Sequence, residues 1–167
     1  MSNSLSTRPW WTYIQEDLQE LLNQSLLLIQ VFADGHHDGN KFHDYSFVVF
    51  PAAKAYEGFL KKIFQDLGFI SEEDFYGKRF RIGRALNPAL ESDFRGSESV
   101  YDKMVSFCQG RELPDVLWET WKSGRNMLFH WFPNESNALD FIEAKKKVDE
   151  ILSAMDLAFK ECKLNST

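Results

Sequence analysis

The segment SGRNMLFHWFP, Ser123 to Pro133, sets an arginine and a histidine among apolar and aromatic residues. Arg125 keeps its positive charge at every pH of interest and suits an anionic phosphate. His130 can act as a general acid when it is protonated and as a general base when it is neutral. Together they supply what metal-free cleavage of an RNA phosphodiester needs. The histidine serves the 2′-OH attack or the departing 5′-oxygen, and the arginine serves the charge that develops on phosphorus.

The same residues also have a purely structural interpretation. On an ideal helix Asn126 and His130 share a face, whereas Arg125 and His130 lie roughly 140° apart and meet only at a helix end or between two copies of the helix. Arg125 would then be a surface residue. His130 would cap the last helical turn, where the helix C-terminus favours the protonated imidazole. The spacing alone favours this structural interpretation, because an arginine and a histidine five residues apart are common by chance.

A resemblance to a known family favours the chemical interpretation. RNMLFH, residues 125–130, resembles the R-x4-6-H motif of the HEPN superfamily, in which a polar residue, here Asn126, often follows the arginine. FPAAKAYEGFLKKIFQDLGFI, residues 50–70, is similar to the corresponding helix in the HEPN domain of RNase LS-type toxins, where an acidic residue, here Glu57, completes the site. Phe132 replaces the tyrosine that marks HEPN toxins silenced by a nucleotidyltransferase antitoxin, so that subclass is not indicated.

The resemblance implies a role for each residue of the site. His130 is expected to be the general base or acid, and Arg125 is expected to hold the scissile phosphate and its developing charge. Asn126 is expected to position the substrate, and Glu57 to orient Arg125 or His130. Considered without the resemblance, Glu57 equally suits a solvated pair with Lys61, four residues later on the same helix face.

The implied function is that of a metal-independent endoribonuclease that cleaves RNA by 2′-OH attack, without a cofactor. Such a protein would be the toxin or effector of a bacterial toxin–antitoxin or phage-defence system. Its expected partners are the RNA substrate, a second copy of the chain whose motif faces the first across one cleft, and a cognate antitoxin protein. The alternative is a non-catalytic HEPN-like module that binds RNA, a nucleotide or a partner protein, and the net charge of −6 favours this alternative.

A basic stretch offers a second candidate contact with RNA. GKRFRIGR, residues 77–84, surrounds Phe80 with four cations: Lys78, Arg79, Arg81 and Arg84. Cations beside an aromatic ring can hold a phosphate backbone and stack a base. The alternative is a solvated loop that balances the acidic surface.

The segment DGHHDGNKFHDY, residues 34–45, is the most metal-like in composition. It contains the six potential ligands Asp34, His36, His37, Asp38, His43 and Asp44. Zinc sites need ligands at fixed spacings on a firm scaffold, and a loop with two glycines and no cysteine does not provide one. The sequence therefore predicts a solvated loop between helices and no metal site.

The pattern of apolar residues indicates which elements position these side chains. Pro51 lies inside one predicted helix and either kinks it or restarts it, Ser71 with Asp74 could cap a short helix in an irregular region, and Pro133 closes the helix of the motif. We expect an all-α bundle of four to five helices, a single domain over residues 1–167 with residues 1–8 as a flexible N-terminus. Apolar residues recur every three or four positions in five segments, which predict helices: 10–33, 44–67, 99–108, 114–131 and 136–162.

Composition restricts the class of protein. With 44% hydrophobic and 26% charged residues, the chain is globular in character, and it has no apolar run of membrane-spanning length. No secretory signal pattern is present. Cys108 and Cys162 are the only cysteines, which suits reduced thiols in a cytoplasmic protein. Three tryptophans that flank the motif are expected to pack in the core or at a dimer seam: Trp118, Trp121 and Trp131.

Overall fold

The computed structural model describes residues 5–33 and 42–162. These residues form eight α-helices, two 3-10 turns and one π-helix, with no β-strand among them, and the all-α prediction is therefore confirmed. The count of helices exceeds the predicted four to five, because the region expected to be irregular folds into short helices: α3 (Glu72–Tyr76), α4 (Ile82–Ala85) and α5 (Ser92–Glu98). Within the described residues, none of the helices combines the length and the apolar character needed to cross a membrane.

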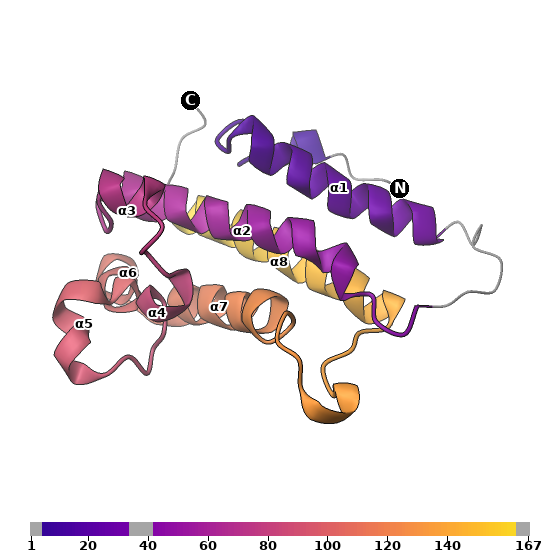
Figure 1. Ribbon diagram of the computed structural model, residues 1–167. Helices are drawn as coiled ribbons and strands as arrows, with labels where there is room; N and C mark the ends of the chain where they lie inside the picture. Colours follow the sequence, from indigo (N-terminus) through magenta and orange to yellow (C-terminus); the bar gives the residue numbers. More distant parts are fainter. Residues whose placement is uncertain (1–4, 34–41, 163–167) are drawn as a thin grey trace.

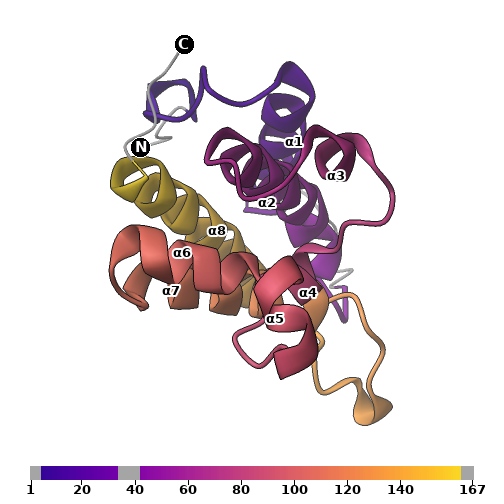
Figure 2. The same cartoon turned by 90° about the vertical axis from the view of Figure 1, so that its left-hand side faces the viewer.

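Four helices form the body of the molecule: α1 (Glu16–Ala33), α2 (Ser46–Asp66), α7 (Glu112–Trp121) and α8 (Phe141–Glu161). α2 and α8 pack side by side, α1 covers one face of this pair, and α7 packs on the other face (Figure 1). The view in Figure 2 shows α6 (Val100–Cys108) beside α7 at the edge of the bundle. The central helix α2 supplies three fully buried aromatic side chains, Tyr56, Phe59 and Phe64, and Trp10 from the N-terminal segment is a fourth. Another face of α2 carries side chains that are exposed or half-buried.

The helix α2 continues through Pro51, which has no N–H to donate. The buried hydroxyl of Ser25, on α1, donates to the carbonyl of Val48 (2.8 Å) and accepts from the N–H of Ala52 (2.9 Å). In an uninterrupted helix these two backbone groups would bond to each other. Ser25 therefore satisfies the backbone beside the proline and fixes α1 to α2.

The N-terminal segment packs on the bundle from Leu5 onward. Leu5 is buried in a 3-10 turn (Leu5–Thr7), and Arg8 forms an ion pair with Asp156 of α8. The indole N–H of Trp10 donates to the other oxygen of Asp156 at 2.7 Å. Residues 5–8 thus belong to the packed structure rather than to the expected flexible N-terminus, and α1 begins at Glu16 instead of Trp10.

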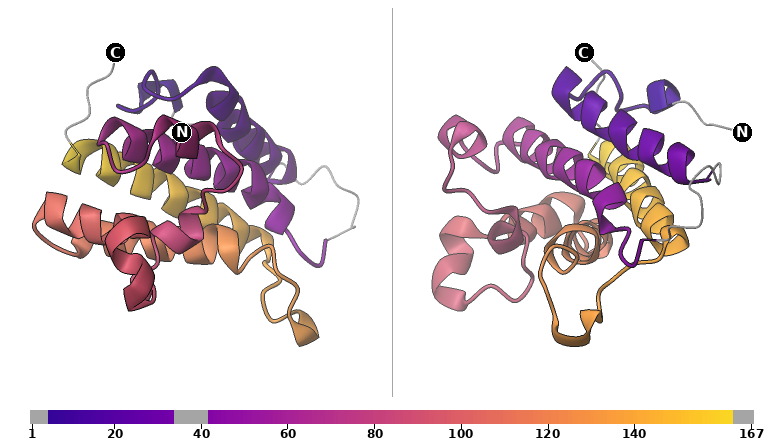
Figure 3. Two further views of the ribbon diagram at one scale, coloured as in Figure 1. Left: turned by 60° about the vertical axis from the view of Figure 1, so that its left-hand side comes forward. Right: turned by 45° about the vertical axis from the view of Figure 1, so that its right-hand side comes forward.

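Local capping groups explain other helix starts. Ser71 and Asp74 form the expected capping box of α3. α8 begins at Phe141, later than the predicted start at residues 136–137, because Asp140 and Glu143 form a capping box there. α7 begins at Glu112, before Pro114. Between α7 and α8, the part of the chain around a short 3-10 turn (Pro133–Glu135) extends from the bundle (Figure 3).

Candidate functional site

The helix that carries the motif ends earlier than the sequence predicts. α7 stops at Trp121, and residues 122–126 form a π-helix (η2), in which the N–H of Met127 donates to the carbonyl of Lys122 at 2.9 Å. Residues 127–129 form a turn, and His130 lies on a bend. The amide of Asn137 donates to the carbonyls of Met127 (3.1 Å) and His130 (2.7 Å), and so replaces the bonds of a longer helix. The predicted helix through residues 130–131 is therefore wrong.

An ion pair between Glu57 and Arg125 joins α2 to the π-helix. Nε of Arg125 donates to Oε2 of Glu57 at 3.3 Å, and the two side chains are 34% (Glu57) and 40% (Arg125) exposed. The other two guanidinium nitrogens make no hydrogen bond with any described residue, so they remain available to an anion. Lys61 does not pair with Glu57. Its Nζ donates to the carbonyl of Phe75 at 3.3 Å instead.

The side chains of His130 and Asn126 form no hydrogen bond with either residue of this ion pair. His130 is exposed on a bend beyond the helix end, so it does not occupy the predicted last helical turn. Its imidazole makes no hydrogen bond or ion pair with any described residue. Asn126 ends the π-helix and is half-buried, and its side chain likewise has no hydrogen-bond partner among the described residues. The geometry brings together two of the four candidate residues, Glu57 and Arg125.

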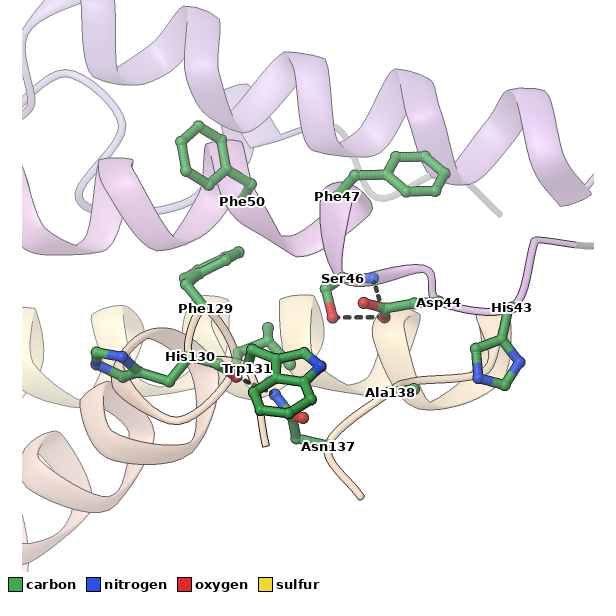
Figure 4. Close-up of a pocket in the computed structure, with 11 residues that line it drawn as sticks. His43, Asp44, Ser46, Phe47, Phe50, Phe129, His130, Trp131, Asn137 and Ala138 are labelled. Atoms are coloured by element: carbon green, nitrogen blue, oxygen red, sulfur yellow. Dashed lines mark hydrogen bonds between the residues drawn. The ribbon is translucent and has the colours of Figure 1, made fainter. Parts of the chain in front are cut away.

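His130 instead lines a pocket between the start of α2 and residues 128–138, with a volume of about 490 Å³. We call it the aromatic pocket, after the four rings that line it: Phe47, Phe50, Phe129 and Trp131. Figure 4 shows the imidazole of His130 directed away from Asp44 and His43, which lie on the opposite side of the pocket. Trp131 is 78% exposed, so it does not pack in the core, and of its two expected places only a dimer seam stays a prediction. Trp118 and Trp121 do stack, with ring centroids 5.9 Å apart, and Trp121 is buried.

Asp44 organises one wall of the aromatic pocket. Its carboxylate accepts from the hydroxyl of Ser46 (2.6 Å), the N–H of Ser46 (2.9 Å) and the N–H of Leu139 (3.1 Å). Partial burial alone would raise the pKa of Asp44, but these hydrogen bonds outweigh burial and lower the pKa. An ionised Asp44 therefore ties the start of α2 to the segment before α8.

The metal-like segment can be followed only in part. Four of its six potential ligands lie outside the described residues: Asp34, His36, His37 and Asp38. His43 and Asp44 line the aromatic pocket. Across residues 5–33 and 42–162, no group of three or more histidine, cysteine or acidic side chains could hold a metal ion.

The basic stretch connects α3 to α4, and all four of its cations are exposed: Lys78, Arg79, Arg81 and Arg84. Arg84 is engaged within the chain, since its Nε lies 2.5 Å from the carboxylate of Glu98 and its guanidinium lies 4.4 Å from the ring centroid of Phe94. Arg81 donates to the carbonyl of Lys78. The side chains of Lys78 and Arg79 have no such partner among the described residues, and they are the more available cations for a ligand.

Gly83 docks the basic stretch on the end of α7. A Cβ atom at this position would lie 2.2 Å from Cη2 of Trp121, so the close approach requires glycine. Trp121 directly precedes the π-helix of the motif. Phe80 lies beside α2, where Nζ of Lys61 is 5.9 Å from its ring centroid. The basic stretch thus adjoins the helix face that carries Glu57.

One face of α2 links the aromatic pocket, the ion pair and the basic stretch. Its side chains recur at intervals of three and four residues, and we call them the α2 stripe: Phe47, Phe50, Lys54, Glu57 and Lys61. The two phenylalanines line the pocket, Glu57 holds Arg125, and Lys61 meets Phe80. Phe47, Phe50 and Lys54 were not among the site residues expected from the sequence. Their spacing relative to Glu57 was the signal that could have identified them.

The chemistry available here is that of an anion site beside an aromatic site. Arg125 can hold a phosphate, and the rings of the neighbouring pocket can hold a flat or apolar group. His130 can exchange a proton at the pocket, but within one chain no described contact joins it to Arg125. Comparison with known proteins found no family model, no curated protein and no solved structure that matches the chain.

Proposed function

We propose that the chain is a metal-independent endoribonuclease of HEPN type, the toxin or effector of a bacterial toxin–antitoxin or phage-defence system. The ion pair of Glu57 with Arg125 is the observation that carries the proposal. It joins the two separate segments on which the HEPN resemblance rests, 68 residues apart in the chain. Because only Nε of Arg125 is engaged, Glu57 can fix the guanidinium while its other nitrogens bind a phosphate.

The proposed reaction is an internal transesterification. Neutral His130 accepts the proton of the 2′-OH, the 2′-oxygen bonds to phosphorus, and the bond from phosphorus to the 5′-oxygen breaks. The 5′-oxygen takes a proton from an acid, and the products are a 2′,3′-cyclic phosphate and a 5′-hydroxyl. Arg125 stabilises the charge on the five-coordinate phosphorus, and Asn126 positions the substrate. A second copy of the chain brings its motif to the same cleft, which supplies a second His130 as the acid.

A non-catalytic binding module is the second candidate. Within one chain His130 lines the aromatic pocket, whereas Arg125 and Glu57 do not. The net charge of −6 also favours binding at one restricted site over a surface that binds nucleic acids in general. Such a module would bind RNA, a nucleotide or a partner protein and would show no turnover.

Cleavage of a labelled cellular RNA in excess EDTA tests the proposal. The wild type and a Lys145→Ala control, changed at an exposed cation of α8, are expected to cut, and Arg125→Ala and His130→Ala are expected to lose at least 100-fold in rate. The cut ends should carry 2′,3′-cyclic phosphates. Equal inactivity of all four proteins, or a requirement for a divalent ion, would refute the ribonuclease proposal, and RNA binding without turnover would support the binding module.

A further inference from the structure

The aromatic pocket gathers large side chains that the fold leaves accessible. Phe47 is 37% exposed, Phe50 48% and Trp131 78%, and all three border the same cavity. Exposed apolar groups that gather around a hollow mark ligand or partner sites, whereas single exposed apolar residues need no explanation. The cavity of about 490 Å³ falls within the size range of small-molecule sites.

The rings are arranged to receive a flat group. Phe50 and Phe129 meet edge to face at 89°, with centroids 5.2 Å apart, and so form a corner at the wall of the pocket. Trp131 lies at the front of the pocket in Figure 4 and stacks with no other ring among the described residues. An indole without a ring partner at a cavity is a platform on which a nucleobase can stack.

A hydrogen-bonding group lies beside these rings. Both N–H groups of the Asn137 amide are used, because the amide donates to the carbonyls of Met127 and His130. This double donation fixes the orientation of the amide and leaves Oδ1, which has no donor among the described residues, as an acceptor. The three donors to Asp44 all reach Oδ1, so its Oδ2, which accepts from no described residue, is a second acceptor at the pocket. The polar edge of the pocket therefore favours a ligand that donates.

A cation lies beside the aromatic pocket, where the phosphate of a bound nucleotide would lie. Lys54 is exposed, its Nζ is 5.8 Å from the ring centroid of Phe50, and it forms no ion pair with a described residue. Along the α2 stripe the next side chain is Glu57, which holds Arg125. A base in the aromatic pocket would thus direct its phosphate along Lys54 toward Arg125. An apolar protein side chain carries no negative charge that Lys54 and Arg125 could bind.

We infer that the aromatic pocket binds one nucleobase of single-stranded RNA, with a preference for bases that carry an exocyclic amino group. The choice of an RNA base rests on the proposed function. Trp131 and Phe50 stack on the base, Oδ1 of Asn137 accepts from its amino group, and Lys54 binds the adjacent phosphate. Uracil, which has no amino group, is the weakest of the four bases in this pocket.

Quenching of tryptophan fluorescence by nucleoside monophosphates tests this inference without any cleavage. Saturable quenching is expected with AMP and CMP, about tenfold weaker binding with UMP, and none with ribose 5-phosphate. Trp131→Phe should abolish the quenching, whereas Trp118→Phe, changed away from the pocket, should retain it. Lys54→Met should weaken AMP binding at least threefold, but this variant should bind adenosine, which has no phosphate, as tightly as the wild type.

Contrary results are equally specific. Quenching that persists in Trp131→Phe, or equal binding of ribose 5-phosphate and AMP, would overturn the inference. A Trp131 signal that changes with protein concentration alone would show that a second copy occupies the pocket, and would overturn it as well. Nucleotide binding without RNA cleavage would refute the proposed ribonuclease and leave this inference intact. RNA cleavage by a protein whose fluorescence is not quenched by nucleotides would refute this inference and leave the proposed ribonuclease intact.

Discussion

Replacing Gly83 by alanine should destabilise the protein, although alanine is the better helix former. The added Cβ would lie 2.2 Å from Cη2 of Trp121. Carbon atoms pack at about 3.5–4.0 Å, so α4 or the indole must move by roughly 1.3 Å or more. Trp121 is only 8% exposed and stacks on Trp118, so its ring has little room to move. Such overpacking costs about 1–3 kcal/mol, and the helix propensity of alanine offsets about 1 kcal/mol.

The net expectation is a loss of up to about 2 kcal/mol in the free energy of unfolding, or up to about 8 °C in Tm for a chain of this size. Urea unfolding followed by circular dichroism measures it. Gly96→Ala is the matched control, because Gly96 also lies in a short helix but its Cβ would meet nothing within 4 Å. This control should be stabilised by about 0.4–1 kcal/mol.

Gly83→Ala should also disturb the motif, because Trp121 directly precedes the π-helix. The amide of Met127, which closes the π-helix, is expected to exchange its hydrogen faster in Gly83→Ala than in Gly96→Ala. A Gly83→Ala protein at least as stable as the wild type would refute the docking of the basic stretch on Trp121. Unchanged exchange at Met127 would refute the coupling of that contact to the motif.

Three further perturbations test other contacts. A double-mutant cycle with Glu57→Gln and Arg125→Ala should give a coupling energy of only about 0.2–1 kcal/mol in urea unfolding, because both side chains are about one-third exposed or more. A coupling energy above about 2 kcal/mol would show that the ion pair mainly stabilises the fold. Ser25→Ala should lower the free energy of unfolding by about 1–3 kcal/mol, because it removes the hydroxyl that bonds to Val48 and Ala52. Ser153→Ala, on the exposed face of α8, should change it by no more than about 0.5 kcal/mol. Equal effects of the two changes would contradict the role given to Ser25. Burial raises the pKa of the Cys162 thiol to about 12, above its value of about 8.5 in an unfolded chain, so the unfolded chain loses this proton first and the free energy of unfolding falls as pH rises from about 9 to 12. Cys162→Ala should reduce that slope, and an unchanged slope would show that other groups cause it.

Features set by neighbouring residues in the chain could be predicted from the sequence. The apolar spacing of α2 and the capping box of Ser71 with Asp74 depend on residues a few positions apart, and both occur. Phe132 has the extended backbone expected before Pro133. These are local steric and hydrogen-bonding effects, which periodicity and residue type report directly.

Features set by distant residues could not be predicted in this way. The helix of the motif was expected to reach His130, because its apolar pattern continues to Trp131. It ends at Asn126 because Asn137, on a later segment, binds the carbonyls beyond that point. The partner of Glu57 depended on the resemblance, since spacing along α2 equally allowed Lys61. Only the packing of α2 against the π-helix separates the two.

Asn137 connects the position of His130 to the recognition of a base. Its amide nitrogen holds the backbone of His130 at 2.7 Å, and its amide oxygen, at the edge of the aromatic pocket, accepts from no described residue. A base that binds this oxygen therefore acts on the same side chain that positions the histidine. Asn137→Asp tests the link, because a carboxylate keeps the acceptor but cannot donate to either carbonyl. If the link is real, this variant should still bind AMP but should lose cleavage at least tenfold, whereas Asn137→Ala should lose both; cleavage by Asn137→Asp at the wild-type rate would show that His130 is positioned independently of the pocket.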